Sequence, residues 1–372
     1  MRVAFRADSN AVIGTGHVMR DLALAQELAA QGAEVRFVCR HIGQAQSEAI
    51  RRYGFALDLL PQSDNRPIVP DDHSSWLGVS WQRDAEETLA AVKAGGGVDW
   101  LVADHYGLDA AWHSRVRTAG CRIAVIDDLA DRKYDCDLLV DQSVAADPRI
   151  RYGGRVPPKA LVLSGPRFAL LRPEFREALK VRRARDGAVS HVLVSYGGVD
   201  RTGETLKALS ALASLDAPPQ VDVVVGAANP HRNEIRDRTA ALPFAHLHVD
   251  TPLMAELALK ADLAFGSAGG SALERCCLGL PSIITVSAAN QKRGALALDR
   301  AGAALVLGEA DEVSVGNLRM ALIGLMALPS ELRSMGERAA AICDGEGTRR
   351  VVSRMEALAM YLRPARSTDC VP

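Results

Sequence analysis

A histidine next to two glycines near the N-terminus is the first candidate for chemistry in this chain. Gly14-Thr15-Gly16-His17 follows a short apolar run at residues 2–6 and precedes apolar residues at helical spacing that end at Gly32. Glycines allow a sharp turn and a close approach to a ligand, and the free N–H groups of a helix N-terminus favour an anion. His17 can accept or donate a proton near neutral pH. Taken alone, the segment fits an anion site with a catalytic histidine as well as it fits an ordinary glycine-rich turn.

Polar residues also follow other apolar runs of the first half. Asp8 follows the first run, Asp104-His105-Tyr106-Gly107 follows a middle one and Asp127-Asp128 follows the next. An acid, an imidazole and a phenol at one strand end are more polar chemistry than a plain turn needs, although the acids could cap helices and the tyrosine could simply pack. The candidates for substrate binding in this half are Asp8, Gly14, Gly16 and Asp104.

The second half carries two glycine loops that suit phosphate. Ser195-Tyr196-Gly197-Gly198-Val199-Asp200 and Gly266-Ser267-Ala268-Gly269-Gly270-Ser271 each follow an apolar run and open a predicted helix, so each offers backbone N–H groups to an anion without a lysine or a metal. Neither loop ends in Gly-Lys-Ser/Thr, which argues against phosphoryl transfer from ATP. The first-half turn has Met19 where a dinucleotide fingerprint needs glycine, which weakens a dehydrogenase interpretation.

Three more polar residues lie close to these loops in the sequence. Glu274 stands three residues after Ser271, where it could accept hydrogen bonds from ribose hydroxyls or complete a Ser-x-x-Glu capping box. Asn290 and Gln291 follow a later apolar run. Their amides suit the hydroxyl and amide groups of a sugar, but they could also be a helix cap and a solvated neighbour.

The composition limits the classes of function. The chain has 372 residues, 48% of them hydrophobic and 24% charged, with a formal net charge of −1, which suits a folded soluble protein and gives no electrostatic footprint for nucleic acid. Its cysteines are odd in number and include no Cys-x-x-Cys pair, so neither a disulfide framework nor a zinc site is indicated. We recognise no leader and no apolar run long enough to span a bilayer, and therefore expect a cytoplasmic protein without stable membrane association. The arginine-rich stretch at residues 182–185 is interpreted as a solvated helix face.

Apolar runs alternate with helical patterns almost throughout, which predicts an α/β protein with parallel sheets. The pattern is interrupted by a glycine and two prolines at residues 165–173, continues with a charged helix at 174–185, and then restarts. We therefore predict two Rossmann-like, doubly wound domains that face a cleft, at residues 1–165 and 166–361, with a disordered tail at 362–372 and ligands at the carboxyl ends of the strands. The polar loop at residues 61–80 is long enough for a lid or a binding segment, but a surface insertion explains it equally well. The predicted strands are residues 2–6, 35–39, 56–60, 101–104, 122–127, 137–140 and 160–163, then 191–195, 220–225, 245–249, 263–266, 282–286 and 304–307.

In their order along residues 1–305, these motifs resemble one family, the UDP-2,4-diacetamido-2,4,6-trideoxy-β-L-altropyranose hydrolases of pseudaminic acid biosynthesis. The second half alone also resembles the peptidoglycan N-acetylglucosaminyltransferase and its two-domain relatives of the GT-B type, which bind UDP-sugars. The pieces that carry the resemblance to the hydrolases are residues 5–8, 13–20, 104–107, 127–128, 168–175, 197–200 and 267–274.

The resemblance implies a hydrolase that releases UDP by attack of water at the anomeric carbon and needs neither a metal nor another cofactor. It makes His17 the catalytic histidine and Tyr106 an active-site tyrosine, and it places the UDP on the second domain. Because UDP is already a good leaving group, such an enzyme mainly has to place a water, take its proton and stabilise the charge of the diphosphate. The implied nucleotide contacts are Gly198, Ser267, Gly269, Gly270, Ser271 and Glu274, and the implied contacts to the sugar or diphosphate are Asn290 and Gln291.

Two other functions stay open at this point. A glycosyltransferase of the same fold would use His17 to deprotonate an acceptor hydroxyl, although residues 44–53 show no obvious apolar or basic patch for a lipid acceptor. A UDP-sugar-binding module would take up ligand without turnover, which the clustering of polar residues at the first-domain strand ends disfavours. The expected partners are a UDP-sugar and water, with no nucleic acid, and the sequence leaves the oligomeric state and the configuration of the sugar open.

Overall fold

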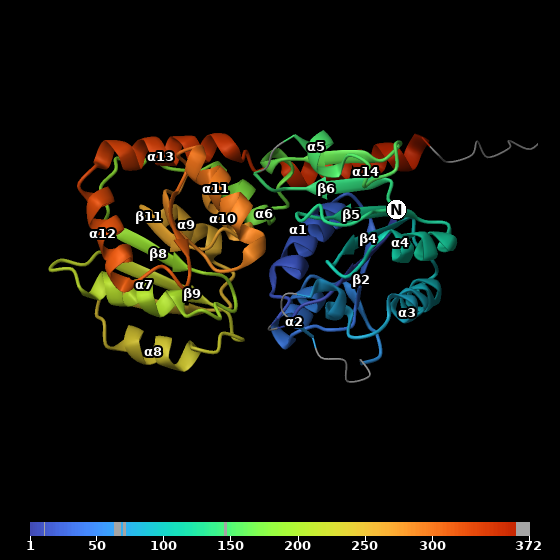
Figure 1. Ribbon diagram of the computed structural model, residues 1–372, viewed down its shortest axis with the longest axis horizontal. Coiled ribbons are helices and arrows are strands. Elements are labelled where there is room, and N and C mark those ends of the chain that lie inside the picture. The colour runs from blue at the N-terminus through green and yellow to red at the C-terminus, as the bar shows by residue number, and fades with distance from the viewer. Residues whose placement is uncertain (11, 63–67, 70–71, 145–146, 362–372) are drawn as a thin grey trace, which may run out of the picture.

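The computed structural model describes residues 1–10, 12–62, 68–69, 72–144 and 147–361 of the chain. They form two lobes that lie side by side along the long axis of the molecule, each built on one parallel β-sheet covered by helices (Figure 1). The prediction of an α/β protein with two doubly wound domains is confirmed. The tail at residues 362–372, for which the sequence predicts disorder, lies outside the described residues.

The first lobe holds a seven-stranded parallel sheet in the order β3-β2-β1-β4-β5-β6-β7. All five residues of β4 are buried, and an apolar run such as Trp100-Leu101-Val102-Ala103 suits a strand that is covered on both faces. One core lies under helix α1 and a second under α3 and α4, on the opposite face of the sheet. The strands are β1 (Arg2–Ala7), β2 (Glu34–Cys39), β3 (Ala56–Leu59), β4 (Trp100–Asp104), β5 (Arg122–Ile126), β6 (Leu138–Asp141) and β7 (Leu161–Ser164). The helices are α1 (Gly16–Ala30), α2 (Gln44–Arg52), α3 (Trp81–Ala94), α4 (Ala110–Val116) and α5 (Pro148–Tyr152), with short 3₁₀ turns η1 (His73–Leu77), η2 (Arg117–Ala119) and η3 (Pro166–Phe168).

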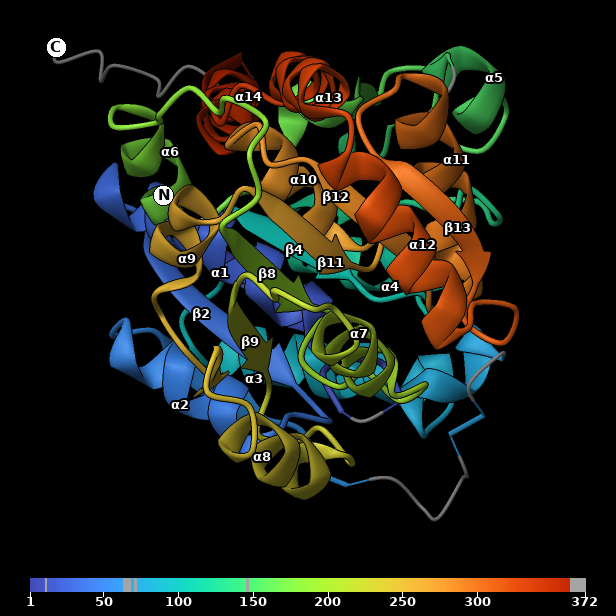
Figure 2. The same ribbon diagram turned by 90° about the vertical axis from the view of Figure 1, so that its left-hand side faces the viewer.

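The second lobe repeats the plan with a six-stranded parallel sheet in the order β10-β9-β8-β11-β12-β13. Figure 2, with this lobe in front, shows its strands between α7 and α12 on one side and α9 and α10 on the other. The strands are β8 (His191–Ser195), β9 (Gln220–Val225), β10 (Ala245–Val249), β11 (Leu263–Gly266), β12 (Ser282–Val286) and β13 (Leu305–Glu309). The helices are α6 (Pro173–Leu179), α7 (Glu204–Ala213), α8 (Arg232–Ala240), α9 (Met254–Lys260), α10 (Gly270–Cys277), α11 (Lys292–Arg300), α12 (Val315–Met326), α13 (Pro329–Ile342) and α14 (Gly347–Tyr361), with the 3₁₀ turn η4 (Ala289–Gln291) before α11.

The last helix, α14, returns to the first lobe. Val351, Val352 and Met355 are fully buried in the core of that lobe, beside α1. At the crossing, Thr348 Oγ1 donates to the carbonyl of Leu171 at 3.0 Å. The sequence-based division assigns residues 166–361 to the second domain. We propose that a boundary near residue 165 separates the two sheets, with α14 crossing back over it.

The arginine-rich stretch at residues 182–185 is not helical, so the predicted helix face is wrong, although Arg182 and Arg183 are exposed to solvent. The helix α6 ends at Leu179, before this stretch begins. Arg185 donates to the carbonyls of Leu278 and Ala258 at 2.8 and 2.9 Å, which lie at the C-terminal ends of α10 and α9. The last carbonyls of a helix have no partner within it and carry partial negative charge, so a guanidinium satisfies several at once. A run of arginines can face solvent or bind the carbonyls at helix C-termini, and amino-acid composition does not distinguish these two environments.

Candidate active site between the two lobes

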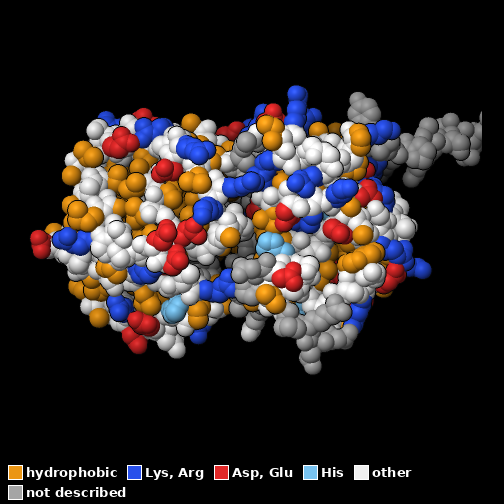
Figure 3. Space-filling model, in the orientation of Figure 1, with side chains coloured by type: hydrophobic (Ala, Val, Ile, Leu, Met, Phe, Trp, Pro, Cys, Tyr) orange, Lys and Arg blue, Asp and Glu red, His pale blue; other side chains and the backbone are white. Residues whose placement is uncertain are grey.

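Each sheet reverses its strand order at one place. In the first sheet β1 lies between β2 and β4, and in the second sheet β8 lies between β9 and β11. Open parallel sheets bind ligands beside the carboxyl ends of the strands at such a reversal. The segments that follow β1, β4, β8 and β11 carry most of the predicted site residues. The surface is hollowed between the two lobes, and a histidine side chain is visible in the hollow (Figure 3).

His17 is held by a carboxylate at the end of the neighbouring strand. Its Nδ1 lies 2.6 Å from Asp104 Oδ1, and Arg20, one turn further along α1, donates to both oxygens of Asp104 at 2.6 and 2.5 Å. Burial alone would raise the pKa of the Asp104 carboxyl, but the charges of Arg20 and His17 outweigh it and hold the pKa below its usual range. Arg20 also places a donor 3.2 Å from Nδ1, but the contact with Asp104 is shorter. An ionised carboxylate only accepts hydrogen bonds, so Nδ1 carries the imidazole proton. Nε2 is then the basic nitrogen, and it has no hydrogen-bonding partner within the described part of the chain.

The turn before His17 is shaped by its glycines. Gly14 has a φ of +83°, which disfavours any side chain, and its N–H closes the turn onto the carbonyl of Asn10 at 2.9 Å. Gly16 is exposed at the first position of α1, and Thr15 makes no side-chain capping bond. The turn therefore places His17, which is buried, beside the end of β4 and leaves the first N–H groups of α1 without a side-chain partner.

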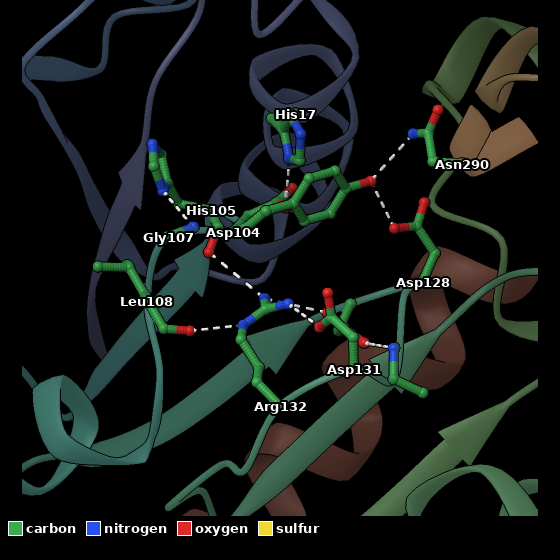
Figure 4. A network of polar contacts seen from close by, with 12 residues as sticks. His17, Asp104, His105, Gly107, Leu108, Asp128, Asp131, Arg132 and Asn290 are labelled. Carbon is green, nitrogen blue, oxygen red and sulfur yellow. Dashed lines mark hydrogen bonds and ion pairs between the residues drawn. The ribbon is translucent and has the colours of Figure 1, made fainter. Parts of the chain in front are cut away.

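Tyr106 joins the two lobes. Its hydroxyl donates to Asp128 Oδ1 at 2.5 Å and accepts from Nδ2 of Asn290, a second-lobe residue, at 3.3 Å (Figure 4). The ring meets that of His17 edge-on, with 4.7 Å between the ring centroids. Burial and the negative charge of Asp128 raise the pKa of Tyr106 well above its usual value. The phenol therefore keeps its proton and positions its neighbours rather than acting as a base.

The segment predicted to be a lid or an insertion contributes aromatic rings to the site. Within the described part of residues 61–80, η1 places His73 and Trp76 with ring centroids 4.9 and 5.5 Å from that of Tyr106. Ile13 joins Trp76 and Tyr106 in a small apolar cluster. Tyr106, whose ring meets that of His17, is thus packed against His73, Trp76 and Ile13.

Asp8 and His105 belong to a buried polar network rather than to a surface open to ligand. Asp8 is fully buried and accepts from Arg6 at 2.7 and 3.0 Å and from the backbone N–H of Arg40 at 2.7 Å. His105 Nδ1 accepts from the N–H of Gly107 at 3.0 Å, and burial lowers the pKa of His105 to about 3, so the ring is neutral. The geometry thus gives Asp8 a structural role where the sequence suggests substrate contact. Asp104, equally buried, reaches a substrate only through His17.

The glycine loop after β11 leaves a helix N-terminus open. The first helical residue of α10 is Gly270, and its N-cap, Gly269, has no side chain that could cap it. The first N–H groups of a helix lack partners within it, so here they are available to phosphate oxygens. Beneath the loop, Arg275 is 1% exposed and donates to the carbonyl of Ser267 at 2.6 Å and to the hydroxyl of Ser271 at 3.3 Å. Burial lowers the pKa of Arg275, and no carboxylate of the described residues forms an ion pair with it. An unpaired cation at this depth favours an anion on the loop above it.

The glycine loop after β8 does not offer the same kind of site. Asp200 accepts from the N–H groups of Glu204 and Thr205 at 3.0 and 2.9 Å, so the N-terminus of α7 is already capped. The expectation that both glycine loops offer free N–H groups is therefore wrong for this one. Gly198 instead lies where the lobes meet: a Cβ added to it would stand 3.1 Å from Thr15 Oγ1.

Glu274 and Gln291 lie beside the loop of α10. The capping-box interpretation of Glu274 is wrong, because the N-cap of α10 is Gly269 rather than Ser271. Glu274 Oε1 accepts from Arg172 at 3.1 Å, which leaves Oε2 for a ligand. Gln291 Oε1 accepts from the Ser287 hydroxyl at 3.2 Å, so its amide nitrogen is the group that can face a ligand.

Sequence reasoning missed three arginines of this site, namely Arg20, Arg172 and Arg275. For Arg20 and Arg275 the spacing in the sequence was a usable signal. Arg20 stands three residues after His17 and Arg275 four after Ser271, spacings that place side chains on one face of a helix. Arg172 lies between the lobes, and nothing in the sequence links it to Glu274.

Within the described ranges, no group of three or more His, Cys, Asp or Glu side chains is arranged to hold a metal ion. Of the helices in those same ranges, none is both long enough and apolar enough to cross a membrane. A groove of about 850 Å³ lies elsewhere, between β7 and α14, and none of the site residues described above lines it.

Two doubly wound domains with a site at both strand reversals define the GT-B class of fold, and solved structures agree. The chain is similar to MurG of Acinetobacter baumannii, with a TM-score of 0.63 and 16% identity over 96% of this chain and 99% of that one. It is also similar to a putative UDP-N-acetylglucosamine 2-epimerase of Listeria monocytogenes, with a TM-score of 0.57 and 13% identity over 97% of each chain. Proteins with different names share this fold, so the reaction has to be argued from the site.

Comparison with curated sequences finds relatives of the chain with more specific names. No protein-family model matches the chain. It is 26% identical to the UDP-2,4-diacetamido-2,4,6-trideoxy-β-L-altropyranose hydrolase of Campylobacter jejuni over 249 residues, 67% of this chain and 76% of that protein. It is 24% identical to the spore coat polysaccharide biosynthesis protein SpsG of Bacillus subtilis over 364 residues, 96% of this chain and 98% of that one. An uncharacterised protein of Methanocaldococcus jannaschii is 24% identical over 76% of this chain, which spans only 55% of the length of that relative. The resemblance inferred from the motifs is confirmed by this similarity.

Proposed function

We propose that the chain is a cytoplasmic UDP-sugar hydrolase that acts in the biosynthesis of pseudaminic acid or a related nonulosonic acid. Its substrate is a UDP-linked 2,4-diacetamido-2,4,6-trideoxy hexose, and it releases UDP by cleaving the C–O bond at the anomeric carbon. The observation that carries the proposal is the arrangement of His17, whose Nδ1 is held 2.6 Å from Asp104 while Nε2 has no partner among the described residues. The similarity to the Campylobacter hydrolase supports the choice of substrate.

His17 is the general base of this reaction. Nε2 takes a proton from a water molecule as the water oxygen bonds to the anomeric carbon. The imidazolium that forms is stabilised by the negative charge of Asp104. General-base assistance of this kind is typically worth about 10²–10⁴-fold in rate.

The second lobe stabilises the leaving group. The open N-terminus of α10 and the hydroxyl of Ser271 donate to the diphosphate, and Arg275 beneath them supplies positive charge. Glu274 Oε2 accepts from the ribose hydroxyls, while Asn290 and Gln291 contact the sugar or the diphosphate. The hydrogen bond from Asn290 to Tyr106 keeps the amide of Asn290 at the boundary between the lobes.

One assay tests the proposal against its alternatives. Purified protein is incubated with the UDP-diacetamido-trideoxy-altrose, and UDP release is followed with no acceptor present. Rapid release supports hydrolysis. Release only after addition of an acceptor supports a glycosyltransferase, the second candidate, since solved structures named as glycosyltransferases, VinC and CalG4, share the fold. Binding without turnover supports a UDP-sugar-binding module.

The variant His17→Ala isolates the base. It should lose turnover by about 10²–10⁴-fold and still bind UDP, because the proposed UDP contacts lie on the other lobe. His246→Ala is a matched control, since this histidine is exposed on β10 and lies outside the site. Near-normal hydrolysis by His17→Ala would remove His17 from the mechanism.

A further inference from the structure

Asp21 is a buried acid next to the proposed base that the mechanism above does not use. It lies on α1, four residues after His17 and one after Arg20, and this helical spacing turns the three side chains toward the carboxyl end of β4. Asp21 is 0% exposed. Neither of its carboxyl oxygens receives a hydrogen bond from any described donor.

The surroundings of Asp21 do not suit a negative charge. An ionised carboxylate buried without a donor is strongly disfavoured. The nearest cation, Arg20, is already engaged by both oxygens of Asp104 and by Asp128 at 3.4 Å. Burial, followed by the negative charge of Asp104, raises the pKa of Asp21 well above its usual range. A neutral carboxylic acid has one O–H to donate, and Asp104 lies within hydrogen-bonding reach of it.

Asp104 has room for this additional donor. A carboxylate offers roughly four lone-pair positions on its two oxygens. The Nδ1–H of His17 and the two N–H groups of Arg20 use three of them. The remaining position is free for the O–H of Asp21.

We propose that Asp21 is a positioning residue, a neutral carboxylic acid whose O–H donates a hydrogen bond to Asp104 and thereby fixes the carboxylate that orients His17. The inference rests on the proposed role of His17 as the base. With three donor groups around it, Asp104 is a weak base, so the Nδ1 proton stays on the imidazole and Nε2 stays available to take the proton of water. The two acids together carry a single negative charge, on Asp104, and this carboxylate faces both Arg20 and the imidazolium that His17 becomes during the reaction.

The titratable groups around Asp21 come from three elements, α1, β2 and β4. They are Asp104 from β4, Cys39 from β2, and Arg20 and His17 from α1 itself. Burial raises the pKa of the Cys39 thiol well above its usual value, so this neighbour is neutral. α14 contributes the apolar side chains of Val351 and Met355 to this core, and its Arg349 pairs with Glu27, further along α1, at 3.5 Å. Among these described neighbours Arg20 is the cation that acts on Asp21, and its guanidinium is already engaged by Asp104 and Asp128.

Two substitutions of similar size separate a neutral donor from a charge. Asp21→Asn keeps the shape and offers an N–H to Asp104, whereas Asp21→Leu has no donor. We expect Asp21→Asn to keep the kcat and the pH profile of UDP release. Asp21→Leu should lower kcat on the order of 10- to 100-fold with little change in KM, the usual effect of losing a hydrogen bond to a charged group. The ¹⁵N spectrum of His17 should show a proton on Nδ1 in the wild type and in Asp21→Asn, and a smaller share of this tautomer in Asp21→Leu.

The outcomes are distinguishable. Equal damage and an equally altered pH profile in both variants would show that Asp21 acts through a negative charge, which overturns the proposal, as does a wild-type profile in Asp21→Leu. Because burial also raises the pKa of Asp127, Asp141 and Glu204, the infrared spectrum of Asp21→Asn is subtracted from that of the wild type. The difference should contain the band of one protonated carboxyl, and a difference without that band overturns the proposal even if Asp21→Leu does not fold. The spectroscopic measurements need no substrate. If the wild type releases no UDP, the proposed function fails while they still decide the state of Asp21.

Discussion

Replacing Asp104 with asparagine is the most direct test of how His17 is held. Asparagine keeps the shape of the side chain but has one NH₂ group in place of an acceptor oxygen. If the NH₂ group faces His17, Nδ1 becomes an acceptor and the imidazole proton moves to Nε2, so the base is lost. If the amide oxygen faces His17, the NH₂ group faces the guanidinium of Arg20, which now donates to Asp104 at 2.6 Å.

The size of the effect follows from these contacts. Loss of general-base assistance costs about 10²–10⁴-fold. Loss of a hydrogen bond to a charged group costs about 1.5–3 kcal/mol, which corresponds to roughly 10- to 150-fold in rate. Both losses act on the same proton transfer and do not add, so we expect kcat to fall by about 10²–10⁴-fold. KM should change little, because Asp104 is fully buried and reaches the substrate only through His17.

The assay is continuous detection of released UDP over a range of substrate concentrations. Asp109→Asn is a matched control from the same loop, because Asp109 caps α4 by accepting from Ala111 and Trp112 at 2.9 and 3.2 Å. Asparagine caps a helix about as well as aspartate, so this variant should stay active. A folded Asp104→Asn protein with wild-type kcat would refute the argument that Asp104 sets the tautomer of His17.

Three further predictions concern the rest of the site. Arg275→Met should weaken UDP binding by about 10-fold or more in calorimetry, because the loop of α10 loses the unpaired cation beneath it. Tyr106→Phe should lower kcat by roughly 2- to 10-fold in the UDP-release assay, since the lost hydroxyl makes two hydrogen bonds, to Asp128 and from Asn290. Asp21→Asn should stabilise the protein increasingly as the pH rises above about 4. Wild-type Asp21 is protonated when folded and ionised when unfolded, so wild-type stability falls with pH and the difference widens by about 1.4 kcal/mol per pH unit until the folded group titrates.

Each of these predictions has a result that contradicts it. Unchanged UDP affinity in Arg275→Met would separate the buried cation from the anion site, with exposed Arg300→Met as the control. A loss of activity in Tyr106→Phe as large as that in His17→Ala would make the phenol part of the chemistry. A stability difference between Asp21→Asn and wild type that is constant from pH 4 to 8 would mean that Asp21 is ionised in the folded protein.

The sequence was sufficient to predict which residues gather at the candidate site, for a reason that lies in the geometry of parallel sheets. Strands of one direction end at one edge, so polar residues that directly follow separate strands come together there. Gly16 and His17 after β1, Tyr106 after β4 and Gly270 after β11 were all found in this way. The alternation of apolar runs and helical patterns predicted each of the thirteen strands of the described residues, with ends that differ by at most two residues.

The partners of each acid could not be predicted in the same way. Asp8 and Asp104 both end a buried strand, and in the sequence they look alike. Asp8 has Arg6 two residues earlier, and because side chains two apart share one face of a strand, the pair satisfies itself in the interior. Asp104 has Ala103 and Val102 before it, so its partners come from α1, about 85 residues away along the chain. A pairing over that separation depends on how helix and strand pack, which no local pattern encodes.

Arg20 and Arg275 lie on the two helices that begin at the glycine turns, and they differ in their partners. α1 and α10 both begin at a glycine turn beside a strand reversal, both start without a side-chain cap, and each carries an arginine within its first two turns. Arg20 is neutralised by Asp104, whereas Arg275 has no carboxylate partner in the described part of the chain. The N-terminus of α1 therefore stands over a paired charge and that of α10 over an unpaired one. An anion gains more at α10 than at α1, which is why we assign the diphosphate to the second lobe and leave the first turn the task of aiming His17.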